Sequence, residues 1–302
     1  MKKVSTKLKA YFFAAAILIF AVILLETVAL FKSYDYSANY FNSSLLVSIM
    51  RALIAVSAIA FFSSFIFIPK KELNGSSPLT LAALIPSGIT AAVFAATGII
   101  FWLAVLGNKA VLSFFTGLGV TYTVVLVIGG LFLLIGAAYF IINFVADKNV
   151  VKTVHPVFGF AVPVAVAISI ISGHFDISVS MNADAKITFQ VAGVFFMLWF
   201  LTELRVLVGK PAPRAYFAFG LTSSLLSASA SVPFIIAFCA GIIKAPVFPT
   251  YIIYTVLALA MFAYTFTRTA VFVFARAAFE RIAPPEIEPE TYEENGENDE
   301  KV

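Results

Sequence analysis

The stretch AYFFAAAILIFAVILLETVALF, residues 10–31, contains one charged side chain, Glu26, in 22 positions. A helix of about 20 apolar residues, rising 1.5 Å per residue, crosses the roughly 30 Å hydrocarbon core of a bilayer. A strand of this length would be too long and would need an alternating pattern that the stretch lacks. We therefore predict a membrane-spanning helix, which satisfies its backbone hydrogen bonds within the segment.

Apolar runs of the same kind recur along most of the chain. Of the 302 residues, 61% are hydrophobic and 12% are charged, and the mean hydropathy is +1.00, whereas a soluble domain carries about a quarter charged residues. We predict an all-α polytopic membrane bundle with eight spans, one of which is shorter, begins at a proline and is required by the charge pattern. The predicted spans are 10–31, 45–68, 79–106, 118–146, 156–173, 187–208, 215–243 and 247–268.

The lysine and arginine positions predict the orientation, because short cytoplasmic loops are enriched in these residues. With the N-terminus inside, fifteen of the twenty fall on the cytoplasmic side and one, Arg51, lies within a span. Only four fall outside: Lys32, Lys109, Lys186 and Lys244. We therefore predict a plasma-membrane protein with both termini in the cytoplasm.

The end of the chain differs in composition from the rest. From Glu280 to Val302, nine acidic and two basic residues give a charge of −7, so the remainder carries +11 against a total of +4. We predict a transmembrane domain at 1–282 and a disordered acidic cytoplasmic tail at 283–302, which could bind a cytoplasmic protein. The basic excess is spread over short loops, which indicates membrane topology and not nucleic-acid binding.

The predicted spans form four out-and-back hairpins, 10–68, 79–146, 156–208 and 215–278. The three inner connections share an order of basic residues followed by proline, and the third, fifth and seventh spans each contain a proline. Two interpretations remain open. Basic residues and prolines can simply mark inner loops, or the hairpins can be internal repeats of the kind that place transporter sites at repeat boundaries.

Two charges inside the first hairpin are the most informative candidates for a site. Glu26 and Arg51 lie 12 and 13 residues from Ala38, the centre of the intervening loop, and so are predicted at equal depth. A charge within a span is costly unless it is paired or hydrated. We predict a Glu26–Arg51 ion pair, which could either fix the register of the two helices or line an outward-facing polar cavity.

A second charged group lies near the predicted inner surface. Glu203, Arg205 and Arg268 follow long apolar runs, so all three could extend to the interface. Residues two apart on a helix face different ways, so Glu203 and Arg205 are poor partners. The sharper alternative is a contact between Glu203 and Arg268 on different helices, which Asn143 could join.

The seventh span contains a stripe of small hydroxyl residues followed by a proline. Ser223, Ser227 and Ser231 recur every four residues, and Pro233 follows. Such a stripe suits close helix packing. It also suits a solute path, because a proline frees a backbone carbonyl and can interrupt the helix there.

The sequence contains no motif that indicates an enzyme, a cofactor or a metal. The two histidines, His155 and His174, are predicted on opposite sides of the membrane, and neither HExxH nor GxSxG occurs. His174, Asp176 and Asp184 share a predicted outer loop, where three polar residues are more often simply solvated than metal ligands. Besides the lipid bilayer, the predicted partner is a small solute of a transporter or channel-like protein. The alternative is a non-transporting scaffold, sensor or assembly component, and an intramembrane enzyme comes third.

Overall fold

The computed structural model describes residues 6–35, 40–68, 81–108, 111, 120–145, 155–175, 183–242 and 249–274. Among these residues, eight helical segments are long and apolar enough to cross a membrane. The predicted eight-span, all-α bundle is therefore confirmed. The predicted acidic tail lies outside the described residues.

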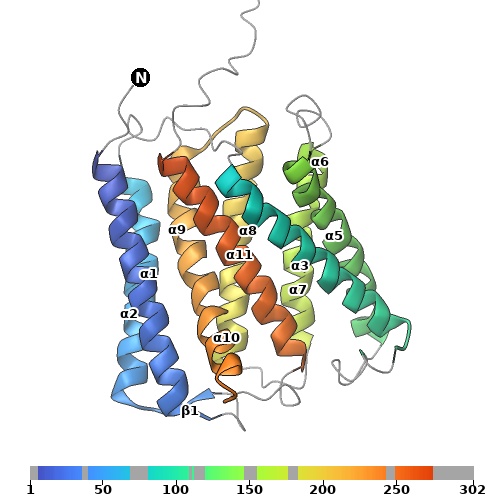
Figure 1. The fold of residues 1–302 in the computed structure, drawn as a ribbon, viewed down its shortest axis with the longest axis horizontal. Helices are drawn as coiled ribbons and strands as arrows, with labels where there is room; N and C mark the ends of the chain where they lie inside the picture. The colour runs from blue at the N-terminus through green and yellow to red at the C-terminus, as the bar shows by residue number, and fades with distance from the viewer. Residues whose placement is uncertain are drawn as a thin grey trace, which may run out of the picture.

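Consecutive spans run in opposite directions, and the start of α1 and the end of α11 lie at the same end of the bundle (Figure 1). The helices are α1 Thr6–Ser33, α2 Leu45–Phe67, α3 Leu81–Val105, α5 Val120–Val145, α6 His155–Gly159, α7 Ala161–Phe175, α8 Asp184–Leu207, α9 Pro213–Ser229, α10 Val232–Cys239 and α11 Pro249–Phe274. Two short antiparallel strands, β1 Tyr34–Asp35 and β2 Tyr40–Phe41, connect to α1 and α2 at the other end. We call these the terminal end and the strand end; the sequence predicts that the strand end is outside.

Two of the spans are broken near their prolines. The fifth span consists of α6 and α7, which are separated at Phe160, three residues before Pro163. The seventh consists of α9 and α10, with a turn at Ala230 and Ser231 and with Pro233 in the first turn of α10. The predicted interruption at Pro233 is confirmed. A proline cannot donate to the carbonyl one turn earlier, which favours a break at this position. Pro86, in contrast, lies inside the continuous helix α3.

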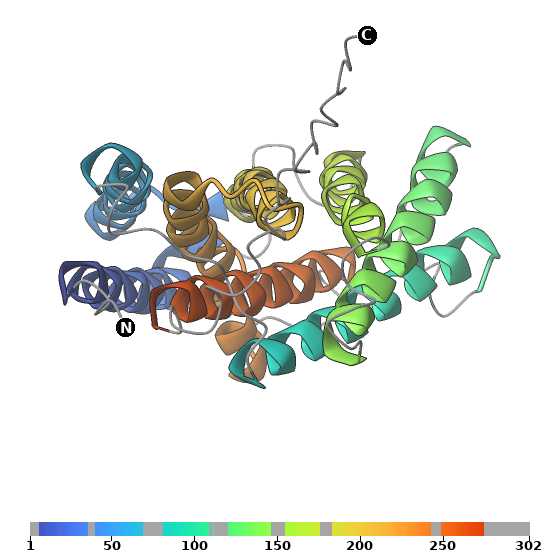
Figure 2. The same cartoon turned by 90° about the horizontal axis from the view of Figure 1, so that it is seen from above.

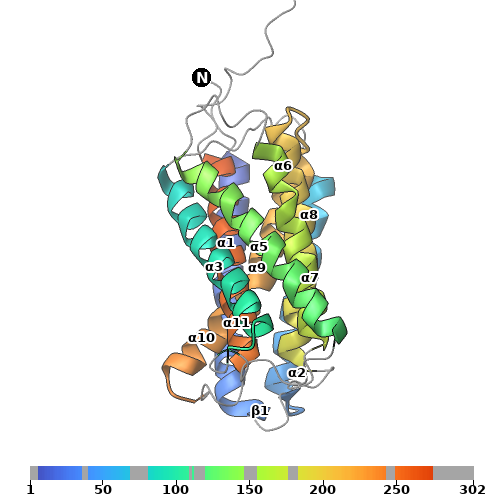
Figure 3. The ribbon, with the colours of Figure 1, turned by 90° about the vertical axis from the view of Figure 1, so that its right-hand side faces the viewer.

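The helix α9 is the centre of the bundle. It packs against α1, α2, α8 and α11, and of the residues from Tyr216 to Ser229 all but Phe219 are buried. The hairpin of α1 and α2 forms one edge of the bundle, and the hairpin of α3 and α5 forms the other (Figures 1 and 3). A helix that is surrounded by other helices can carry serine and threonine on all faces, because none of its faces meets lipid.

Glycines bring α3 and α5 together. A Cβ atom on Gly98 would lie 3.0 Å from the carbonyl oxygen of Gly130, and a Cβ on Gly130 would collide with the ring of Trp102. Small residues at such crossings allow the two backbones to approach closely, which is how membrane helices gain packing energy without a hydrophobic effect between them.

Candidate functional site

Asp184 links three elements at the strand end. It is the first residue of α8, where the partial positive charge of the helix N-terminus favours a carboxylate. Its Oδ2 atom accepts a hydrogen bond of 3.1 Å from the backbone N–H of Phe41 on β2. Its carbonyl oxygen accepts a hydrogen bond of 2.8 Å from the hydroxyl of Thr188. Asp184 thus holds the strands against the start of α8.

Arg51 on α2 is the cationic partner of Asp184. Its Nη2 atom donates a hydrogen bond to Asp184 Oδ1 at 2.6 Å. The helices α2 and α8 both pack against α9, so this ion pair bridges two helices that lie side by side on α9. The side chains of Arg51 and Asp184 are 55% and 24% exposed. A pair as exposed as this contributes little to stability.

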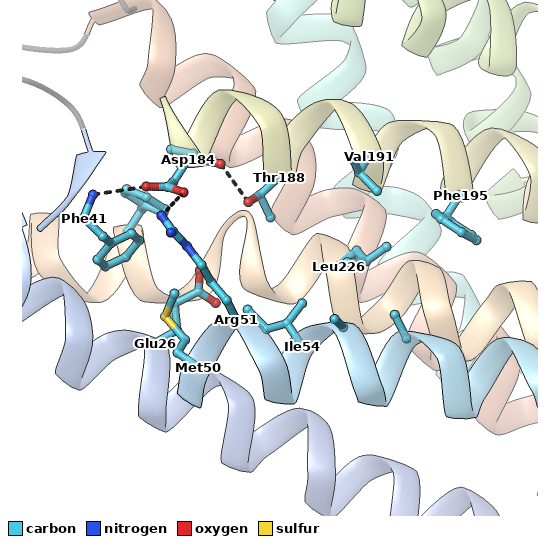
Figure 4. Close-up of a pocket in the computed structure, with 14 residues that line it drawn as sticks. Glu26, Phe41, Met50, Arg51, Ile54, Asp184, Thr188, Val191, Phe195 and Leu226 are labelled. Atoms are coloured by element: carbon cyan, nitrogen blue, oxygen red, sulfur yellow. Dashed lines mark hydrogen bonds and ion pairs between the residues drawn. The ribbon is translucent and has the colours of Figure 1, made fainter. Parts of the chain in front are cut away.

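Glu26 on α1 has a different partner from the one predicted. It is buried, and its Oε2 atom accepts a hydrogen bond of 2.5 Å from the hydroxyl of Ser229 on α9. The predicted Glu26–Arg51 ion pair is therefore wrong. Equal depth did bring both side chains to one cavity, but the long Arg51 side chain extends toward Asp184 at the strand end (Figure 4). Depth along a helix does not specify the direction in which a side chain points.

The cavity beneath Arg51 and Asp184 has a volume of about 300 Å³. Fourteen residues of α1, β2, α2, α8, α9 and α10 line it, of which four are polar: Glu26, Arg51, Asp184 and Thr188. The polar side chains gather at the strand end, and Ile54, Val191, Phe195 and Leu226 continue the cavity away from it (Figure 4). The cavity is thus charged at one end and apolar along the rest.

Phe195 lies at the apolar end of the cavity and packs against two other phenylalanines. The ring centroids of Phe62 on α2, Phe195 on α8 and Phe219 on α9 are 5.8 to 6.5 Å apart. Phe195 follows Asp184 by eleven residues, which corresponds to about 16 Å along the helix. The cavity therefore extends over about half of a 30 Å hydrocarbon core, and the three rings lie near the middle of that core.

A second charged pair lies toward the terminal end. Arg268 on α11 donates hydrogen bonds from Nε, at 2.9 Å, and from Nη2 to the same Oε1 atom of Glu203 on α8. The two side chains are only 2% and 1% exposed. The predicted Glu203–Arg268 contact is confirmed, and the alternative in which both residues extend to the interface is wrong. Arg205, in contrast, is exposed and donates to the carbonyl of Lys210.

Aromatic rings pack around this end of the bundle. The ring of Trp199 lies 5.5 Å from Tyr216 and 5.7 Å from Tyr264, and Tyr139 lies 5.3 Å from Phe200. All five side chains are fully buried. Asn143 is buried as well, and its participation in the Glu203–Arg268 contact stays a prediction. The terminal half of the bundle is therefore filled with aromatic rings, whereas the strand half contains a cavity.

The serine stripe, which runs from α9 into the turn before α10, does not line the cavity. Ser223, Ser227 and Ser231 are completely buried, and Gly220, one turn before Ser223, faces Thr269 of α11 and Trp199 of α8. Ser231 donates to the carbonyl of Ser227 at 2.6 Å. Within the described part of the chain, the hydroxyls of Ser223 and Ser227 have no hydrogen-bond partner. The role of the stripe as a solute path stays a prediction.

Sequence reasoning missed Asp184 as a partner of Arg51, because it placed this residue in a loop. A usable signal was present: an acidic residue directly before an apolar run is typical of a helix N-terminus. Lys186 was also placed in that loop, but it lies in the first turn of α8 and is only 4% exposed. Among the described residues, no three His, Cys, Asp or Glu side chains are close enough together to hold a metal ion; Asp176 lies outside them.

The eight spans and the buried charges establish the general class of the molecule. The chain is an α-helical multi-pass membrane protein. No family model, no curated protein and no solved structure matches it. Its function must therefore be inferred from its own geometry.

Proposed function

We propose that this membrane protein is a small transporter whose cavity at the strand end takes up a solute. The observation that carries the proposal is the 300 Å³ cavity, which Glu26, Arg51 and Asp184 line at one end. Charged side chains are rare in membrane spans and commonly mark substrate or ion pathways. A cavity of this size is at the lower limit for small-molecule sites.

The two halves of the bundle differ in the way that alternating access requires. A transporter opens its central site to one side at a time, by movement of one group of helices against another. Here the strand half contains the cavity, Phe195 lies at its end against Phe62 and Phe219, and buried rings fill the terminal half. We infer that the three phenylalanines act as a gate at mid-membrane.

The serine stripe lies on the cavity side of the proposed gate, because Ser223, Ser227 and Ser231 all follow Phe219 in a span that runs from the terminal end to the strand end (Figure 1). Ser223, Ser227 and Ser231 would offer hydroxyls to a passing solute, and the break before Pro233 would let α10 move independently of α9. Phe234 on α10 lines the cavity, so movement of α10 would change the shape of the cavity directly.

The experiment is a thiol-accessibility scan in membrane vesicles of both orientations. The chain has one cysteine, so Cys239→Ser provides a cysteine-free background. Thr188→Cys places a thiol in the cavity, and Thr202→Cys, seven residues after Phe195 on α8, places one beyond the gate. We expect a membrane-impermeant thiosulfonate to label position 188 from the strand-end side and position 202 from the opposite side.

The matched control is Ser169→Cys on α7, a completely buried serine, which we expect to remain unlabelled from both sides. A phenylalanine-gate variant, Phe195→Ala, should increase labelling at position 202. If position 202 is never labelled from the terminal-end side, in either background, the transport proposal is wrong.

A second candidate function is a non-transporting scaffold, sensor or assembly component. The close aromatic packing of the terminal half favours it, because a protein without a transport cycle has no need to open that half. The same scan discriminates between the two functions, since a scaffold predicts labelling at position 188 only.

A further inference from the structure

We propose that the occupant of the cavity is a zwitterionic phospholipid of the leaflet at the strand end, with one acyl chain lying between α2 and α8. This inference names the substrate class of the proposed transporter and so rests on the proposed function. It also makes a claim about binding that can be tested separately from transport.

The cavity opens sideways, between two helices at the edge of the bundle. Seen from above, α9 lies between α2 and α8 (Figure 2). Residues that line the cavity are themselves exposed at the bundle surface, including Ala55 on α2 and Val191 on α8. In a membrane, such apolar side chains at the perimeter meet lipid, so a lipid molecule can reach the cavity without passing through water.

The dimensions of the cavity match one acyl chain of one leaflet. Its apolar part runs along α8 from Thr188 to Phe195, next to Ile54 and Ala58 of α2 and Leu226 of α9. The distance from Asp184 to Phe195 is about 16 Å along the helix, and half of the hydrocarbon core is about 15 Å. A headgroup beside Arg51 would therefore place the end of its chain at the three phenylalanines.

The charges at the strand end fit a headgroup that carries both signs. One guanidinium and two carboxylates, those of Arg51, Asp184 and Glu26, line this end. A guanidinium has five donors; among the described residues Arg51 uses one atom, Nη2, on Asp184, which leaves donors for a phosphate. The carboxylates would face the ammonium group of the same headgroup. A purely anionic headgroup would fit less well, because it would meet two acidic side chains and only one basic side chain.

The headgroup contacts must provide the selectivity. An acyl chain gains little by leaving other chains for the side of a protein, because lipid tails are as apolar as leucine. Charge-assisted hydrogen bonds between guanidinium and phosphate, in contrast, are the strong and directional contacts of such a complex. Replacing the Arg51 guanidinium should therefore weaken phospholipid binding more than any single substitution in the apolar wall that leaves the cavity open.

The test uses the full-length protein in nanodiscs that contain a trace of phosphatidylethanolamine with a diazirine in one acyl chain. After irradiation, the modified peptides are identified by mass spectrometry. We expect cross-links concentrated on α2 and α8 near Ala58 and Val191. Arg51→Gln should reduce them about tenfold, the value for loss of one charge-assisted hydrogen bond.

Two tryptophan variants provide matched controls. Ala58→Trp fills the cavity without touching the charged residues and should abolish the cross-links. Ala52→Trp, on the same helix at an exposed position that does not line the cavity, should leave them unchanged. Thermal unfolding of both variants reports whether each is folded. If Ala58→Trp does not fold, the smaller substitution Ala58→Phe takes its place.

The outcomes separate the two proposals. Equal labelling around the whole bundle, or equal labelling by a diazirine phosphatidylglycerol or monoacylglycerol, overturns the zwitterionic lipid site. Specific cross-links without labelling of Thr202→Cys from the terminal-end side support a lipid-binding protein and overturn transport. Transport-type accessibility without specific cross-links shows that the solute is not a lipid.

Discussion

Arg51 of α2 and Asp184 of α8 form an ion pair of 2.6 Å across the face of α9, above a cavity that Glu26 of α1 also lines. The pair connects the first hairpin to the third, which are more than a hundred residues apart in sequence. It lies at the rim of a cavity and is half exposed, whereas Glu203 and Arg268 are enclosed by protein. The two ion pairs should therefore respond differently to mutation.

Removing one partner of the enclosed pair should be strongly destabilising. Arg268→Leu leaves the Glu203 carboxylate buried without its cation, which we expect to cost about 3–5 kcal/mol in the free energy of unfolding. The double variant Glu203→Leu/Arg268→Leu should recover most of this loss. Reversible unfolding in mixed micelles measures both, and the exposed Arg205→Leu is the control. A double variant no more stable than Arg268→Leu would contradict the pairing.

The exposed pair should have a small coupling energy. In a double-mutant cycle with Arg51→Ala and Asp184→Ala, we expect a coupling below about 1 kcal/mol in unfolding, because both side chains reach solvent or headgroups. The same variants should reduce cross-linking of the phospholipid probe. A coupling as large as that of the enclosed pair would mean that Arg51 is buried in the membrane.

Gly220 should not tolerate a side chain. A Cβ atom there would collide with the hydroxyl of Thr269 and lie 3.1 Å from Nε1 of Trp199. We expect Gly220→Ala to cost about 1–3 kcal/mol through overpacking, with partial recovery in Gly220→Ala/Thr269→Ala. Gly173→Ala is the matched control, because its Cβ would make an ordinary contact of 3.5 Å with Tyr254. Equal melting temperatures for the two alanine variants would show that α9 and α11 pack less closely than the structure indicates at Gly220.

The orientation predicted from the lysines and arginines has a direct test. Reporter fusions after Asn74 and after Val302 should both be active in the cytoplasm, and a fusion at Lys244 should report the opposite side. Introducing two lysines near Asn108 should weaken this preference. Fusions at Asn74 and Val302 that report opposite sides would contradict the predicted number of crossings between them.

The spans could be predicted from the sequence because they depend on a one-dimensional property. A run such as 10–31 must cross a hydrocarbon layer of known thickness as a helix, whatever its neighbours are. The same reasoning made Pro233 a candidate for an interruption, but the missing N–H is not sufficient, because Pro86 also lacks it and lies inside the continuous helix α3. It also placed Glu26 and Arg51 at one depth, where both line the same cavity.

The partners of the charged residues depended on the tertiary structure. Counting residues gives the depth of a side chain but not the angle at which its helix faces the others, and that angle follows from packing across all the helices. This is why Arg51 pairs with Asp184, Glu26 with Ser229, and the serine stripe is buried without lining the cavity. Length and hydropathy determined how often the chain crosses the membrane, and helix packing alone decided which polar groups meet inside it.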